Sequence, residues 1–398
     1  MNTRIAITGI GAVTPLGVGA ETLHSSAVEG ICGIQNGYGR CLDFEPTDFL
    51  GRRETRRTDR FCHLALTAAI EAIEQANISQ QTTYPSEAIT TIIGTAIGGL
   101  QTIEHQIEIV RTHGANASSP LSVPMLMANA ASALIAMRYG FQGEASALTA
   151  ACASSAQAIV AGVRAIRAND ADVAVVGGAE ATLTDFAQSI FLTAGALSPT
   201  GTSLPFHAHR NGFVMSEGAG ILVLERWNTA QARGAKILGE ILGYGTTTDA
   251  FHITSPDPSI TQPVRAIEAA LHSANIKPPD IAYINAHGTG TLINDSIEAR
   301  ILNTTLKENT LQIPISSSKS YLGHLMGAAG AVELIATLLA LRHKTVPATY
   351  GLDKIDPNIA PLNHAVEATK IVENTAIGIS NSLGFGGHNV TITIKATE

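Results

Sequence analysis

The second half of this 398-residue chain repeats the pattern of the first half, and this repeat restricts its possible folds more than any other feature. Residues 282–291 form an apolar run that ends in a Gly/Thr turn, as residues 91–99 do. Residues 376–389 stand where residues 173–181 stand in the first half. Self-similarity of this kind predicts an internal duplication.

Two reactive residue types occupy equivalent places in the repeat. Cys152 and His324 each lie at a junction between a predicted strand and a predicted Ala-rich helix. We therefore predict two related halves, one over 1–240 with the cysteine and one over 241–398 with a pair of histidines.

Short β-rich runs alternate with Ala-rich runs whose apolar residues recur every three or four positions. This alternation predicts an α/β architecture in which the sheets are covered on both faces. The predicted strands are 4–10, 88–97, 145–151, 173–179 and 220–226, and the predicted helices include 63–76, 153–168 and 264–274.

Composition narrows the class of protein. Hydrophobic residues make up 45% and charged residues 15%, which predicts a large core and an extensive subunit interface. The net charge of −8 argues against nucleic-acid binding. The four cysteines show no CxxC pairing, so we expect no metal site, no disulfide framework and a reducing, cytoplasmic compartment. We expect neither a signal peptide nor a membrane span.

Cys152 is the first candidate for chemistry. The thiolate is the reactive form of cysteine, and Cys152 precedes a predicted helix whose N-terminus would stabilise a negative charge. A buried structural cysteine is the commoner state of a lone cysteine in an Ala-rich run. The histidines downstream favour the reactive interpretation.

His287 and His324 both lie in Gly-rich turns after predicted strands, where an imidazole projects into a cleft. Lys319 lies between them in a Ser-rich segment, and Glu333 in the following helix could neutralise its charge. An ordinary buried ion pair is the alternative for Lys319 and Glu333.

Two other motif interpretations fail. The run GIGAVT at 9–14 lacks the third glycine of a dinucleotide-binding fingerprint. A cysteine-protease interpretation leaves His324, Lys319 and the GFGG run at 384–387 without a role.

Four motifs together make the chain resemble the elongating, type II β-ketoacyl-acyl-carrier-protein synthases over its whole length. They are TAACASS at 149–155, NAHGTGT at 285–291, SSSKSYLGHLMGAAGAVE at 316–333 and GFGGHN at 384–389. The resemblance implies the thiolase fold, a five-layered αβαβα structure of two duplicated halves. It also implies a homodimer, with an acyl carrier protein as partner.

The resemblance assigns a decarboxylative Claisen condensation in fatty acid or type II polyketide or polyene synthesis. Cys152 would accept the acyl chain from the carrier's phosphopantetheine, so the chain would need no cofactor of its own. His287 and His324 would bind the malonyl thioester carbonyl and promote decarboxylation. Lys319, paired with Glu333, would order the histidines.

Further roles follow from the same resemblance. The backbone N–H groups of Cys152 and Phe385 would form an oxyanion hole, and Phe385 would gate the malonyl step. Thr289 and Thr291 would bind the pantetheine arm. Ile97 and Phe191 would line the acyl pocket.

A basic stretch predicts where the carrier docks. Arg53, Arg56, Arg57 and Arg60 have a spacing that would place them on one helical face. A local arginine stripe on an acidic protein suits an acidic carrier, and the resemblance assigns docking to the first three. A solvated helix face is the alternative.

The chain departs from its relatives at positions that bear on the substrate. Leu121 and Ser122 replace two aromatic residues in a region that approaches the partner's acyl pocket in the family dimer, so we expect a longer or wider tunnel. His207, Asn211 and Gly195 also replace common family residues. These changes favour a specialised pathway, such as polyketide, polyene or aryl-polyene assembly.

Three other assignments remain open. The chain could be a non-catalytic chain-length-factor-like partner, although its intact Cys152, His287 and His324 argue against this. It could be the catalytic member of a heterodimer with such a partner. Thiolase-like chemistry on coenzyme A esters is disfavoured, because the chain has no cysteine after position 152.

Overall fold

The computed structural model describes residues 3–78, 84–371 and 376–397, and one hydrogen-bonded sheet runs through this part of the chain. The first half of the chain supplies five strands in the spatial order β4 (Ala145–Leu148), β3 (Ile89–Gly94), β5 (Val173–Glu180), β6 (Gly218–Arg226) and β1 (Ile5–Thr14). The second half continues with β7 (Gly239–Thr248), β13 (His388–Ala396), β12 (Ile377–Gly384), β8 (Tyr283–Asn285) and β9 (Ile315–Ser316).

The strand order repeats the duplication that the sequence predicts. In the first half, β3 lies between β4 and β5 and pairs in parallel with both. In the second half, β8 lies between β9 and β12 and likewise pairs in parallel with both. The next two pairings, toward the middle of the sheet, are antiparallel. The halves meet where Ile5–Ile7 of β1 pair with Gly239–Ile241 of β7. The division of the chain at residue 240 stays a prediction.

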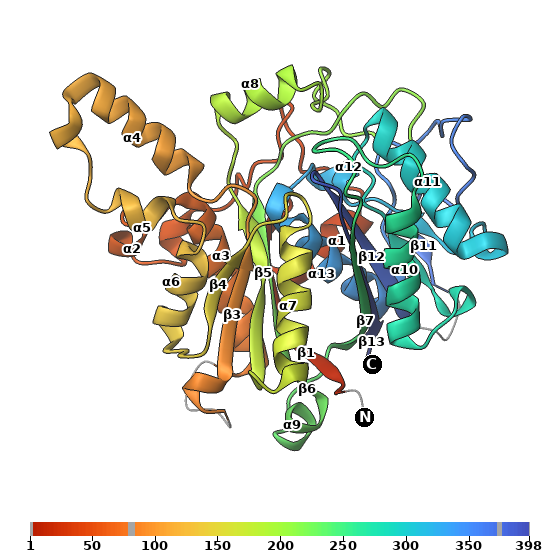
Figure 1. The fold of residues 1–398 in the computed structure, drawn as a ribbon, viewed down its shortest axis with the longest axis horizontal. Helices are drawn as coiled ribbons and strands as arrows, with labels where there is room; N and C mark the ends of the chain where they lie inside the picture. Colours follow the sequence, from red (N-terminus) through yellow and green to blue (C-terminus); the bar gives the residue numbers. More distant parts are fainter. Residues whose placement is uncertain (1–2, 79–83, 372–375, 398) are drawn as a thin grey trace.

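Helices cover both halves of the sheet and fill the space between them, as Figure 1 shows from left to right. One outer layer packs on β1, β5 and β6, the central layer lies between the two halves, and the other outer layer packs on the second half. The outer helices are α3 (Arg60–Ala76) and α6 (Ala130–Tyr139) on one side and α10 (Thr261–Ala274) and α11 (Leu292–Leu306) on the other, with α7 (Ser154–Ala168) and α13 (Ala329–Arg342) at the centre.

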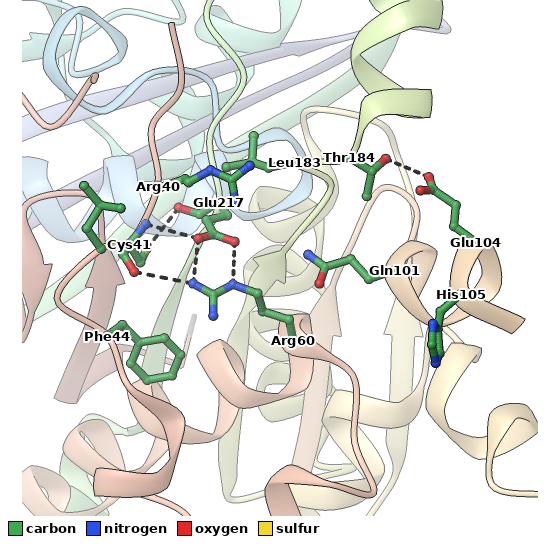
Figure 2. Close-up of a pocket in the computed structure, with 11 residues that line it drawn as sticks. Arg40, Cys41, Phe44, Arg60, Gln101, Glu104, His105, Leu183, Thr184 and Glu217 are labelled. Atoms are coloured by element: carbon green, nitrogen blue, oxygen red, sulfur yellow. Dashed lines mark hydrogen bonds and ion pairs between the residues drawn. The ribbon is translucent and has the colours of Figure 1, made fainter. Parts of the chain in front are cut away.

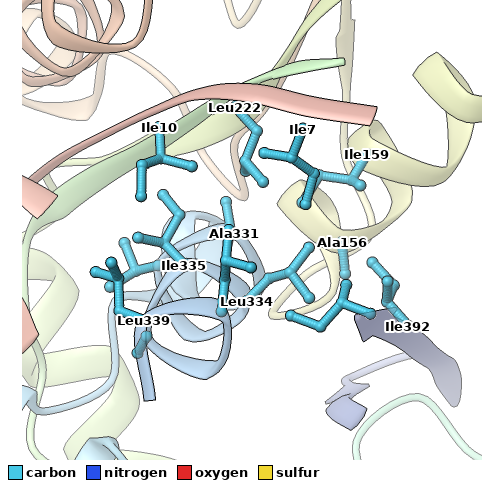
Figure 3. Packing of buried hydrophobic residues seen from close by; sticks show 14 of the residues in the cluster. Ile7, Ile10, Ala156, Ile159, Leu222, Ala331, Leu334, Ile335, Leu339 and Ile392 are labelled. Atoms are coloured by element: carbon cyan, nitrogen blue, oxygen red, sulfur yellow. The ribbon is translucent and has the colours of Figure 1, made fainter. Parts of the chain in front are cut away.

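Apolar residues lie on all sides of the central helix α13, and every residue from Ala329 to Leu341 is buried. A helix of this composition is stable only when neighbours cover all its faces. Figure 3 shows how Leu334 and Ile335 lie between Ile10 of β1 and Ile392 of β13. Each fully buried aliphatic side chain here contributes roughly 1.5–3 kcal/mol, so the two halves are held together by a common core.

The glycines of GIGAVT serve helix packing and bind no phosphate group in this arrangement. A Cβ atom at Gly9 would lie 2.0 Å from the carbonyl oxygen of Ala72, and one at Gly11 would lie 2.0 Å from that of Ala68. Only glycine lets α3 approach β1 so closely.

Three helices project beyond the layers at the left and top of Figure 1. They are α4 (Leu100–His113), α5 (Ser122–Leu126) and α8 (Asp185–Thr193). The remaining helices are α1 (Ala20–Val28), α2 (Arg52–Thr55), α9 (Trp227–Ala232) and α12 (Lys319–Leu322). The remaining strands are β2 (Gly17–Val18), β10 (Thr345–Val346) and β11 (Thr369–Lys370). Among the described residues, no helix has the length and apolar character needed to cross a membrane.

Candidate active site

Cys152 lies in the short turn between β4 and α7, two residues before the helix begins at Ser154. The preceding residue, Ala151, has a positive φ of 50°, which is uncommon for a residue with a side chain. This turn brings Cys152 directly to the N-terminal end of a central helix. The thiol is only partly exposed.

His324 contacts the thiol directly, because its Nε2 lies 3.0 Å from the Sγ atom of Cys152. Its backbone is held in place by hydrogen bonds to Val214 and from Ser216. Its Nδ1 accepts the backbone N–H of Met326 at 3.2 Å. Since Nδ1 accepts, the neutral ring carries its proton on Nε2, which then donates to the sulfur.

His287 faces His324 across the site, with the two ring centroids 5.6 Å apart and the rings nearly perpendicular. Lys319 Nζ lies 3.2 Å from Nδ1 of His287 and donates to its backbone carbonyl at 2.7 Å. An ammonium group can only donate, so Nδ1 accepts and the neutral His287 also carries its proton on Nε2. Both imidazoles are therefore hydrogen-bond donors at Nε2.

Burial and the Lys319 charge together favour neutral imidazoles in the site. Burial lowers the pKa of His287 and His324 well below the usual value, and the nearby Lys319 charge lowers both further. Burial also raises the pKa of the Cys152 thiol to about 11, while the Lys319 charge and a hydrogen bond from the Phe385 backbone act in the opposite direction. The predicted stabilisation of a thiolate is thus outweighed by burial in the resting protein.

Lys319 and Glu333 form the ion pair that the sequence suggests. Lys319 Nζ donates to Glu333 Oε1, and both side chains are fully buried. Lys319 begins the short helix α12, which intervenes between β9 and His324 and has no counterpart before Cys152. The two junctions are therefore equivalent in the topology but not in length.

Phe385 lies at the tip of the β12–β13 hairpin, and its ring is partly exposed. The neighbouring Gly384 packs on the cysteine turn, since a Cβ atom there would lie 2.9 Å from the Ala150 carbonyl and 3.4 Å from the Cys152 nitrogen. The hairpin tip thus places the Phe385 backbone against the sulfur.

The predicted substrate-binding residues fall into two groups. Phe191 contacts Phe213, and Phe213 in turn contacts the His324 ring edge-on at 5.0 Å. Ile97 lies in the β3–α4 loop with its side chain exposed, and its neighbour Ala96 packs against the apolar cluster that contains Phe213. The other three residues make local hydrogen bonds. The hydroxyls of Thr289 and Thr291 lie 2.9 Å apart just before α11. The hydroxyl of Ser122, the first residue of α5, donates to the backbone carbonyl of Ser119.

The arginine stripe does not form the single helical face that its spacing suggests. Helix α2 ends at Thr55, and α3 begins only at Arg60. Figure 2 shows Arg60 turned inward, where its guanidinium donates two hydrogen bonds of 2.7 Å to the buried Glu217. The spacing argument fails because the chain leaves the helical path between these residues. Arg53, Arg56 and Arg57 remain exposed.

Neither of two cavities in the described structure is lined by Cys152, His287 or His324. The larger, of about 630 Å³, is the one drawn in Figure 2, with Arg40, Arg60 and His105 in its wall. The smaller, of about 430 Å³, shares Phe213 with the site. Phe213 thus separates a cavity from His324.

Sequence reasoning missed two buried carboxylates that shape the histidine turn. Glu298 accepts the backbone N–H groups of His287 and Gly288, both at 2.7 Å, and burial raises its pKa to about 7. Asp295 accepts the N–H of Gly290 at 3.2 Å. Their spacing of three residues on α11, just after the turn, is the signal that could have identified them.

Comparison with known proteins agrees with this geometry. The family model "Beta-ketoacyl synthase, N-terminal domain" matches residues 40–230, and "Beta-ketoacyl synthase, C-terminal domain" matches residues 238–353. The chain is 40% identical to the 3-oxoacyl-[acyl-carrier-protein] synthase 2 of Synechocystis sp. over 411 residues, which cover 98% of each protein.

Solved structures show the same architecture. The ishigamide ketosynthase/chain length factor superposes with a TM-score of 0.92 at 30% identity, over 100% of both chains. A type II polyketide acyl carrier protein in complex with its ketosynthase, AntDE:AntF, gives a TM-score of 0.90 at 27% identity, again over 100% of both chains. The five layers are those of the predicted thiolase fold, and the chain belongs to the β-ketoacyl synthase family.

Proposed function

We propose that this chain condenses a cysteine-bound acyl group with a malonyl group carried by an acyl carrier protein. The observation that carries the proposal is the Cys152 sulfur facing His324, with His287 beside it and both rings donating at Nε2. In the first step, the sulfur of Cys152 attacks the acyl thioester of the carrier. The acyl–sulfur bond of the carrier breaks, and the thiol proton passes to the departing pantetheine sulfur.

The two imidazoles serve the second step. The malonyl thioester places its carbonyl oxygen between Nε2 of His287 and Nε2 of His324. The bond to the carboxylate breaks, carbon dioxide leaves, and the electron pair forms an enolate whose oxygen accepts both N–H groups. Donors that meet a charge only as it develops lower the barrier, and each contributes ~3–4 kcal/mol. Neutral imidazoles suit this role, since they keep the N–H without adding a charge.

The third step forms the new carbon–carbon bond. The enolate carbon attacks the acyl–Cys152 thioester, and the backbone N–H groups of Cys152 and Phe385 stabilise the resulting oxyanion. Collapse releases the β-ketoacyl carrier and the Cys152 thiolate, which takes a proton from solvent. The three reaction steps proposed here need no cofactor bound to the chain itself.

The carrier is proposed to dock on the exposed Arg53, Arg56 and Arg57 and to present its pantetheine beside Thr289 and Thr291. The comparison structure AntDE:AntF holds such a carrier on a ketosynthase of the same fold. A cytoplasmic location suits the four cysteines, all of which are free thiols.

We further propose a dimer built on the edge strand β4. This strand pairs only with β3 within the described chain, so its other edge is open. Large exposed apolar side chains gather on the neighbouring helices α4, α5, α6 and α8 and the loops beside them, namely Ile107, Val110, Leu121, Val123, Met127, Met137, Phe186, Ile190 and Leu192. We propose that a second copy of this chain covers the open edge of β4 and these apolar side chains. A chain-length-factor-like subunit is the alternative, which the ishigamide structure favours.

The test of the catalytic proposal is intact-mass detection of acylation. The parent protein should gain one acyl group when mixed with an acyl carrier, and Cys152→Ala should gain none and release no β-ketoacyl product. Cys32→Ser removes a different free thiol and should behave like the parent. Condensation by Cys152→Ala at the parent rate would refute the assignment.

A further inference from the structure

Glu180, the last residue of β5, is a fully buried carboxylate held only by neutral donors. Its Oε1 accepts the Thr95 hydroxyl at 3.1 Å, and its Oε2 accepts the backbone N–H groups of Ala96 at 2.6 Å and Gly327 at 3.1 Å. The backbone of Ile97 also donates to it. Within the described part of the chain, no cationic side chain forms an ion pair with it.

These donors belong to two separate segments of the site. Thr95, Ala96 and Ile97 form the loop that carries the predicted acyl-pocket residue. Gly327 follows Met326, whose backbone N–H donates to Nδ1 of His324 and so fixes the orientation of that ring. One carboxylate therefore joins the acyl-pocket loop to the support of the imidazole.

The same loop is connected to the nucleophile. The Thr149 hydroxyl, three residues before Cys152, donates to the Thr95 carbonyl at 2.9 Å. The contact between the segments is tight, since a Cβ atom at Gly327 would lie 2.3 Å from the Ala96 nitrogen and 2.6 Å from Glu180 Oε2. A movement of the loop must therefore move the segment that supports His324.

Burial raises the pKa of Glu180 to about 7, against the effect of its hydrogen-bond donors. A carboxylate in this place is costly, and its two oxygens meet donors from both segments. Strand β5 itself would form equally well with an apolar residue at this end.

We propose that Glu180 is a positioning residue that couples the acyl-pocket loop to His324, so that the chain held on Cys152 sets the place of the imidazole for decarboxylation. The proposal rests on the proposed function of His324 as a donor to the enolate. A displacement of about 1 Å in such a donor lowers the rate by about a hundredfold.

The test compares Glu180→Ala with Glu180→Gln. The alanine variant loses the connection, whereas glutamine can keep it, because its amide oxygen can accept the Ala96 and Gly327 N–H groups while its amide nitrogen faces the Thr95 hydroxyl. Glu240→Ala is the control, since Glu240 is a buried carboxylate on β7 that pairs with Arg4. The fraction of reactive Cys152 in each protein is first counted by alkylation with iodoacetamide and intact mass.

Malonyl decarboxylation is then measured per reactive site, with Cys152 carrying either an acetyl or an octanoyl group. We expect the parent rate to depend on the acyl group. Glu180→Ala should lower kcat by about tenfold or more at an unchanged KM and remove the dependence on chain length. Glu180→Gln should stay within about threefold of the parent on both measures.

Two results would overturn the proposal. One is a parent-like kcat per reactive site in Glu180→Ala, and the other is an equal loss of acyl transfer and decarboxylation, which a merely structural role would give. Absence of carbon dioxide release by the parent would instead refute the proposed function itself. If Glu180→Ala does not fold, the decisive measurement is made on Glu180→Asp, whose shorter side chain cannot reach both segments. This variant should then lose the dependence of the decarboxylation rate on chain length.

Discussion

At the scale of single residues, Lys319 is the charge that influences every reactive side chain of the site. Burial lowers the pKa of His287 and His324, and the Lys319 ammonium lowers both further. The Lys319 charge lowers the Cys152 pKa by more than the opposing Glu333 charge raises it. Removing Lys319 alone would leave Glu333 as an unpaired buried charge, which costs ~3–5 kcal/mol. A double variant, Lys319→Met with Glu333→Leu, removes both charges together.

The double variant is expected to have a higher Cys152 pKa than the parent. A higher pKa leaves less thiolate at a given pH, so alkylation by iodoacetamide should accelerate only at a higher pH. Intact-mass measurement of the alkylation rate over roughly pH 6 to 10 tests this shift. Arg4→Met with Glu240→Leu removes a partly exposed ion pair elsewhere in the molecule and should leave the profile in place. A shift of the Lys319 variant toward lower pH would contradict the argument.

His364 carries a second residue-scale prediction, which concerns stability. It is buried against Phe206, and neither ring nitrogen has a hydrogen-bond partner among the described residues. Burial lowers its pKa to about 4 from the usual 6.5. Between these values the unfolded chain binds a proton that the folded chain does not, so stability falls as the pH falls from 6.5 toward 4.

We predict that His364→Leu raises the free energy of unfolding by ~1 kcal/mol at neutral pH, because an unpaired buried polar ring is replaced by an apolar side chain. The loss of stability on acidification should also be smaller than in the parent. Some loss should persist, since burial likewise lowers the pKa of His24 to about 4. Denaturant unfolding at several pH values measures both effects. A less stable variant with an unchanged pH slope would show that the ring has partners in solution.

The residues that sequence reasoning identified and missed differ in the kind of partner they have. Cys152, His287, His324 and Lys319 lie in motifs, and their side chains meet one another. Glu298 and Glu180 instead accept backbone N–H groups. No sequence pattern marks the backbone partners of Glu180, so its contacts became visible only in the folded chain. For Glu298, the position on α11 just after the histidine turn is the one signal that the sequence holds.

At the scale of elements, the arginine segment shows the limit of periodicity. Spacing placed Arg53, Arg56, Arg57 and Arg60 on one face, but the helix ends at Thr55. The short stretch has no buried face to hold it, as none of the residues of α2 is buried. Arg60 is fixed by Glu217, whereas the other three arginines stay free for a partner.

We predict that Arg53→Ala, Arg56→Ala and Arg57→Ala combined weaken carrier binding by about tenfold at low salt, with less difference at high salt, because screened charges contribute little. Fluorescence anisotropy of a labelled carrier, titrated at two salt concentrations, measures this effect. Arg265→Ala, an exposed arginine on α10, is the matched control. Equal affinities for the triple variant and the parent at low salt would remove this surface from the docking site.

At the scale of the whole molecule, the repeat in the sequence predicted the architecture well. Both halves build the same strand order, because each repeats the same succession of apolar runs and helices. The sequence did not reveal that the sheet is continuous through β1 and β7. That pairing depends on two strands far apart in the chain meeting at the centre, which no local pattern encodes.

The predicted acyl tunnel belongs to this largest scale, because Ser122 is expected to act on the site of a second copy across the proposed dimer. Its side chain is small and buried on α5, beside the exposed apolar surface proposed for the dimer. We predict that Ser122→Phe shortens the chains the enzyme accepts, since the added ring would fill space at the far end of the partner's pocket. Thr304→Phe on α11, in the other half, controls for added bulk.

Acylation with a series of carriers of increasing chain length measures the cut-off, and native mass of the same samples reports the oligomeric state. A shorter cut-off in an intact dimer supports both the tunnel and the subunit arrangement. An unchanged cut-off in an intact dimer would place the end of the tunnel elsewhere. A monomeric parent that still accepts long chains would show that each chain holds its whole pocket, and the open edge of β4 would then need a different occupant.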